Sequence, residues 1–194
     1  MKIQEVKEKL SRLLVERQER YAEKEATFNR KMADFISNVS AKLDYFRDFF
    51  AIVEMYKEYC DGAVRIERSD LAAFLKDGAV SVEGPCGVSF LTVREMVLGK
   101  NTDGSIAITL YDYEDNAFFK AVLGCDTLAL DMRSMPNGAR RDPVKFFREL
   151  NKLFGILERN CVALVDYIGE KTPSKQSNAF LKKMNVYLDG DAKI

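Results

Sequence analysis

Apolar residues repeat at helical spacing over most of the first sixty residues. The first glycine is Gly62, and no proline precedes it, although these two residue types usually mark the boundaries between elements. Acids four residues before a base, such as Glu5 before Lys9, add stabilising pairs to a helix. The pattern predicts helix over residues 2–59, continuous or with one hinge near residues 37–40, where Ser and Asn favour caps over helix interiors.

The apolar residues divide this predicted helix into three parts. Its second half carries a wide stripe typical of a surface that faces a core, and its start carries a shorter stripe. The wide stripe comprises Phe28, Met32, Phe35, Ile36, Val39, Leu43, Phe46, Phe49, Phe50, Val53 and Tyr56, and the short one comprises Ile3, Val6, Leu10, Leu13 and Leu14. Between them, residues 16–25 offer only Tyr21 and Ala22 for burial. We therefore expect residues 1–27 to form a protruding helical arm and residues 28–194 to form one globular domain.

From Gly62 the period of the pattern changes to two, which indicates strands. The expected strands lie around Val64–Ile66, Val80–Val82, Ile106–Leu110, Ala117–Leu123 and Thr127–Met132. The connections between them are short, and short connections imply an antiparallel meander. Two brief helices are also expected: one over residues 70–77, between a Ser69 cap and Gly78, and one over residues 92–99, which opens on a capping box.

The last third of the chain returns to helical spacing. A loop over residues 133–142 leads to a helix over residues 143–169, with Asp142 as N-cap and Pro143 at its first position. That helix is apolar on much of its circumference, so it should be buried on more than one side. A short terminal helix is expected over residues 177–188. The predicted fold class is α+β: the long N-terminal helix packs with the helix of residues 143–169, beside a small antiparallel sheet.

The amino-acid composition excludes several kinds of catalytic and metal site but identifies none. The chain has no histidine, which excludes catalytic triads with histidine, histidine-ligated zinc and histidine proton shuttles. Thirty basic and thirty acidic residues leave a net charge of zero, so bulk charge attracts neither nucleic acid nor an anionic membrane. The four cysteines contain no closely spaced pair and are expected to be free thiols in a reducing compartment. We expect neither a signal segment nor a membrane span, and we therefore predict a cytoplasmic protein. We also expect no metal and no cofactor.

Two groups of charged residues offer alternative functions. Arg133, Arg140 and Arg141 lie in the predicted loop and could bind a phosphate group or a nucleic acid, because guanidinium groups pair with phosphate oxygens. The loop lacks the ordered glycines of phosphate-binding motifs. The acidic hairpin Asp112–Asp115 could hold a divalent cation in a metal-dependent enzyme, since such cations prefer clustered oxygens. Its spacing matches no EF-hand, and acidic turns are common without any metal.

The preferred interpretation concerns the arm, residues 1–27, and its contact with another chain. An isolated helix gains most of its stability from packing its apolar side, and residues 16–25 offer little to anchor a return to the same molecule. We therefore expect Ile3, Val6, Leu10 and Leu13 to contact another chain, as in a coiled coil. The predicted function is non-enzymatic: a protein for interaction or assembly, with a protein partner or a second copy, most simply as a homodimer. An accessory protein or inhibitor of viral or phage type would fit this composition.

Overall fold

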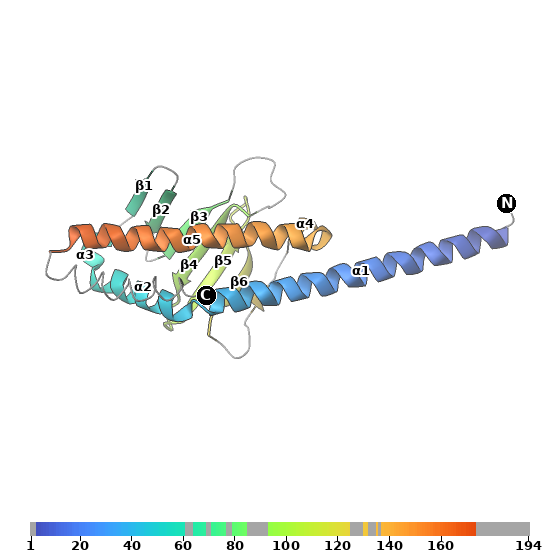
Figure 1. Ribbon diagram of the computed structural model, residues 1–194, viewed down its shortest axis with the longest axis horizontal. Helices are drawn as coiled ribbons and strands as arrows, with labels where there is room; N and C mark the ends of the chain where they lie inside the picture. Colours follow the sequence, from blue (N-terminus) through green and yellow to red (C-terminus); the bar gives the residue numbers. More distant parts are fainter. Residues whose placement is uncertain are drawn as a thin grey trace, which may run out of the picture.

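Two long helices and an antiparallel sheet make up an α+β fold, as the sequence predicts (Figure 1). The computed structural model describes residues 3–60, 64–68, 71–76, 79–84, 93–124, 130–131, 135 and 137–173. The predicted terminal helix of residues 177–188 and Arg133 lie outside the described residues, as does most of the predicted strand Thr127–Met132.

The N-terminal third is helical with two breaks. The helices of the described residues are α1 (Ile3–Ser40), α2 (Leu43–Met55), α3 (Lys57–Cys60), α4 (Asn137–Arg141) and α5 (Pro143–Lys171). The first break falls just after the predicted hinge, at Ala41 and Lys42, where the backbone of Lys42 leaves helical angles. The second falls at Tyr56. The prediction of helix with a hinge is confirmed.

The strands follow one another through the sheet in chain order. Within the described residues they are β1 (Val64–Arg68), β2 (Leu71–Lys76), β3 (Ala79–Glu83), β4 (Glu95–Lys100), β5 (Ile106–Tyr111), β6 (Ala117–Val122) and β7 (Leu130–Asp131). All neighbouring strands pair antiparallel in the order β1 to β7. The predicted meander is therefore confirmed, although the sheet is larger than the sequence pattern suggested.

Three local predictions are wrong. Residues 70–77 do not form a helix, because Leu71–Lys76 is strand β2 and pairs with both β1 and β3. Residues 92–99 do not form one either: Glu95–Lys100 is β4, whose alternate residues Met96 and Leu98 are buried. In both segments the pairing available on two sides outweighs local helix propensity, which is a weak determinant of structure. Conversely, the predicted loop of residues 133–142 contains the helix α4.

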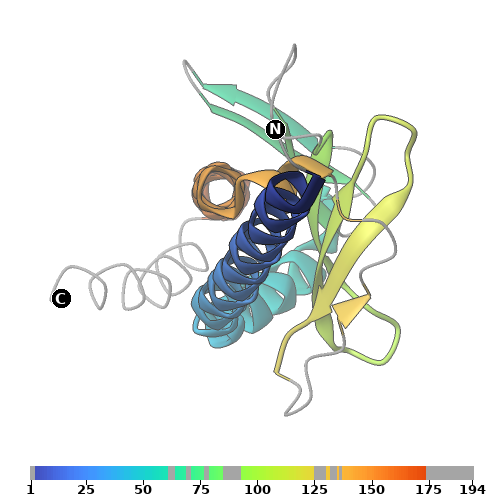
Figure 2. The ribbon, with the colours of Figure 1, turned by 90° about the vertical axis from the view of Figure 1, so that its right-hand side faces the viewer.

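The core forms where helices cover the sheet. The second half of α1 runs parallel to α5, with ring centroids 5.5 Å apart for Phe28 and Phe147 and 6.1 Å apart for Phe35 and Phe154. These rings are buried, as predicted, and so are the predicted α2 residues Phe46, Phe49, Phe50 and Val53. Figure 2 shows α1, α2 and α5 together on one side of the sheet. The helix of residues 143–169 therefore packs with the N-terminal helix, as the sequence predicted.

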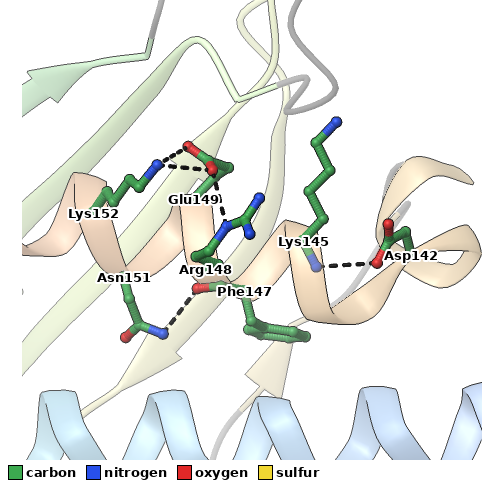
Figure 3. A network of polar contacts seen from close by, with 7 residues as sticks. All are labelled: Asp142, Lys145, Phe147, Arg148, Glu149, Asn151 and Lys152. Carbon is green, nitrogen blue, oxygen red and sulfur yellow. Dashed lines mark hydrogen bonds and ion pairs between the residues drawn. The ribbon is translucent and has the colours of Figure 1, made fainter.

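Polar contacts fix the position of α5. The side chain of Asp142 accepts a hydrogen bond from the backbone N–H of Lys145 at 3.1 Å, which confirms the predicted N-cap (Figure 3). Asn151 points from α5 toward α1, where its Oδ1 accepts a bond of 3.5 Å from Asn38. At the sheet, the buried Asn160 donates to the backbone carbonyl of Ser81 in β3 at 2.9 Å. These bonds fix α5 against both neighbouring layers.

Candidate functional site

The first part of α1 leaves the globular body as an uncovered rod (Figure 1). No described residue of the arm is buried, whereas Phe28, directly after it, is only 5% exposed. Of the four predicted contact residues, Ile3, Leu10 and Leu13 are exposed and Val6 is half-buried. At about 1.5 Å per residue, residues 3–27 form a rod of about 38 Å. Single exposed apolar residues are ordinary, but a row of them along one rod marks a surface that can be covered.

The exposed apolar residues continue the line of the buried ones. At about 100° per residue, Leu10, Leu14 and Tyr21 lie on the same side of α1 as Phe28 and Phe35. Helix α5 covers that side from Phe28 onward, but α5 begins at Pro143, and no described element covers the stripe beyond α4. One helix thus presents a single apolar stripe: its second half is buried by its own chain and its first half faces solvent.

A groove lies where the arm meets the body. It encloses about 160 Å³ and is lined by Tyr21, Lys24, Glu25, Phe28, Asn29 and Arg140. The predicted candidates Arg140 and Arg141 are both exposed on α4, which packs beside α1. The described residues therefore bring Arg140 together with Lys24 of the arm.

The sequence interpretation missed two contributors to this surface. It expected residues 16–25 to face solvent, and all of them are exposed, but Tyr21 and Lys24 also line this groove. A usable pattern was present, because Tyr21 lies seven residues after Leu14 and seven before Phe28, the spacing at which residues share one side of a helix. The approach of Arg140 could not be predicted in the same way, since it depends on how α4 folds.

The acidic hairpin uses one of its carboxylates to build its own turn. Asp112 Oδ1 accepts hydrogen bonds from the backbone N–H groups of Glu114 and Asn116, both at 2.9 Å. These bonds, led by the one from Asn116, lower the pKa of Asp112. Asp115 makes an ion pair of 2.7 Å with Arg94. Among the described residues, no group of three or more acidic or cysteine side chains is arranged to hold a metal ion.

The buried thiol of Cys161 belongs to the core. It lies on the apolar side of α5 and is fully buried, as the sequence predicted. Burial in apolar surroundings raises its pKa well above the ordinary value, because the thiolate loses its hydration there. Thiols react as thiolates, so Cys161 serves packing rather than chemistry.

Comparisons with protein-family models, curated proteins and solved structures give no match to this chain. Among the described residues, no helix combines the length and the apolar character needed to cross a membrane. Within the part of the chain that the structure describes, the exposed stripe of α1 and the groove at its base form the candidate surface.

Proposed function

We propose that this is a non-enzymatic interaction or assembly protein of the cytoplasm, whose arm docks on another polypeptide. The observation that carries the proposal is the uncovered half of the α1 stripe. Leu10, Leu13 and Leu14 are each more than half exposed, on a helix whose continuation is buried against α5. A partner that lies along the arm would extend the same packing and remove this apolar surface from water. The partner is a second copy, as in a homodimer, or a different protein.

The test compares the intact chain with variants of its exposed stripe. We expect the Leu10→Gln, Leu13→Gln and Leu14→Gln triple variant, or deletion of residues 1–25, to lose either concentration-dependent mass in light scattering or a partner retained in a pull-down. The unfolding transition of the globular body should persist, because these residues are exposed. A triple substitution on the opposite side of the arm, Glu8→Gln, Arg12→Gln and Glu19→Gln, is the matched control. The proposal is wrong if the stripe variant keeps both the mass and the partners of the intact chain.

Two other functions remain as alternatives. Binding of phosphate or nucleic acid would use the guanidinium groups of Arg140 and Arg141, which are exposed side by side in sequence on α4. It predicts binding that weakens as salt is raised and that falls in the Arg140→Ala, Arg141→Ala variant. A metal-dependent enzyme would use the hairpin Asp112–Asp115, and it predicts a thermal shift with magnesium or calcium that Asp112→Asn removes.

A further inference from the structure

Positive charge gathers along one side of the exposed stripe. At about 100° per residue, five of the arm's cations lie within about 100° of the midline through Leu10 and Phe28. They are Lys7, Lys9, Arg17, Arg20 and Lys24, and all five are exposed. Arg17 lies about 20° from the midline, and Lys24, Arg20 and Lys9 follow on the same side of it. The other side of the sector holds Lys7 and one acid, Glu25. One flank of the stripe is therefore cationic, and the other has no net charge.

The acids of the arm lie on the other side. Glu5, Glu8, Glu16, Glu19 and Glu23 point away from the stripe, with Arg12 as the one cation among them. Residues 3–27 thus contain six acids and six bases, and the arm as a whole is neutral. Polyanions such as nucleic acids and anionic membranes are attracted by net positive charge, which this segment lacks. A partner that docks along the stripe meets five of the arm's six cations but only one of its six acids.

The groove at the base adds a cation from the globular body. Arg140 from α4 lines it together with Lys24, Glu25 and the rings of Tyr21 and Phe28. A partner that lies along the arm would therefore meet α4 at the base of the arm, and α4 would limit how far the contact extends. Arg20 also forms an ion pair of 3.6 Å with Glu16, but both side chains are well exposed, and such pairs are weak enough for a partner's carboxylate to replace.

A second copy of the chain does not complement this surface. When two arms meet antiparallel, stripe to stripe, the cationic flank of each lies beside that of the other. When they meet parallel, the cationic flank lies beside the flank of Lys7 and Glu25, which has no net charge. Pairing by coiled-coil rules favours opposite charges beside the apolar seam and is opposed by like charges. Neither arrangement supplies carboxylates to match the four cations of that flank, so the flank favours a partner with carboxylates beside its own apolar seam.

We propose that the arm's partner is a protein with an acidic amphipathic helix, whose apolar side packs on Leu10, Leu14 and Tyr21 while its flanking carboxylates face Arg17 and Lys24. This inference rests on the proposed function, since it requires that the arm docks on another polypeptide. It adds the chemistry of the partner and excludes a stripe-to-stripe homodimer. Charge pairs of this kind contribute mainly to specificity and to the rate of association.

The experiment uses two synthetic helical peptides of about the arm's length. Both carry the same leucine stripe, and the positions beside it are glutamate in one peptide and lysine in the other. Their binding to the intact chain is followed by fluorescence anisotropy. We expect the glutamate peptide to bind at least about tenfold more tightly at low salt, with the difference shrinking as salt is added because screening weakens exposed charge pairs.

A matched pair of variants separates docking from bulk charge. Arg17→Glu lies on the stripe side and Arg12→Glu on the opposite side, and the two substitutions change the net charge equally. We expect Arg17→Glu to weaken binding of the glutamate peptide at least about fivefold and Arg12→Glu to change it less than about twofold. Both are exposed positions, so neither should impair folding, which circular dichroism checks.

Each other outcome overturns the inference. Equal binding of the two peptides, binding of neither, or equal effects of the two variants would show that the cationic flank of the stripe does not select an acidic partner. Tighter binding of anionic vesicles or of a single-stranded oligonucleotide, lost in Arg17→Glu, would replace the protein partner by a polyanion. A homodimer in sedimentation velocity that the leucine triple variant abolishes would also overturn it, but would leave the proposed function intact.

Discussion

The same leucine-to-alanine substitution, made once at a buried position and once at an exposed one, tests whether the arm packs against its own molecule. Leu157 on α5 is 0% exposed, whereas Leu13 on the arm is 51% exposed. Truncating a fully buried leucine to alanine removes its transfer free energy and leaves a cavity, which together cost about 3–4 kcal/mol. The part of Leu13 that is covered is covered by neighbouring turns of its own helix, so Leu13→Ala should change the free energy of unfolding by no more than about 0.5 kcal/mol.

Urea unfolding of both variants, followed by circular dichroism at low protein concentration, gives the comparison. Low concentration matters because any self-association would add stability that depends on concentration. A cost above about 2 kcal/mol for Leu13→Ala under these conditions would mean that the arm packs against its own molecule, and the reasoning would fail. A cost below about 1 kcal/mol for Leu157→Ala would refute the description of the core.

Three further substitutions or reactions test the interior. Asn160→Ala should cost about 2 kcal/mol in urea unfolding, since it removes the bond to Ser81 and leaves a small cavity; an unchanged midpoint would contradict the bond. Gly84→Ala should lower the melting temperature markedly, because a Cβ at this buried position would overlap the backbone carbonyl oxygen of Val93; a variant as stable as the parent would show that the two strands can move apart. In a variant whose other cysteines are serine, Cys161 should react with a maleimide only after unfolding, since burial disfavours its thiolate; rapid labelling of the native protein would place this thiol at the surface.

The sequence was most informative where the apolar repeat extends over many residues. The stripes of α1 and α5 extend over many turns, so their helices, the N-cap Asp142 and the burial of Phe35 or Cys161 could be predicted from spacing. The two strands mistaken for helices, β2 and β4, are six residues each. A segment that short has too few apolar positions to separate a period of two from a period of 3.6, and its pairing partners lie elsewhere in the chain.

The candidate surface was predictable only in part. The exposed leucines of the arm follow from a stripe without an obvious partner, and the structure describes them as exposed. The distribution of charge around that stripe is also present in the sequence, but it becomes meaningful once the helix is shown to continue unbroken from Ile3 to Ser40. Arg140 and Lys24 line one groove only because residues 137–141 form the helix α4. The sequence pattern predicted a loop there, since Asn137 and Gly138 are residue types that favour turns.

We propose that another polypeptide covers the stripe of the arm when the protein works. Photo-crosslinking inside the cells that produce it tests this directly, with a benzophenone amino acid placed either at Leu13 on the stripe or at Glu19 on the opposite side. We expect an efficient crosslink to a second polypeptide from Leu13 and little or none from Glu19. A crosslink from Leu13 only to residues of its own chain, or equal yields from the two positions, would contradict it.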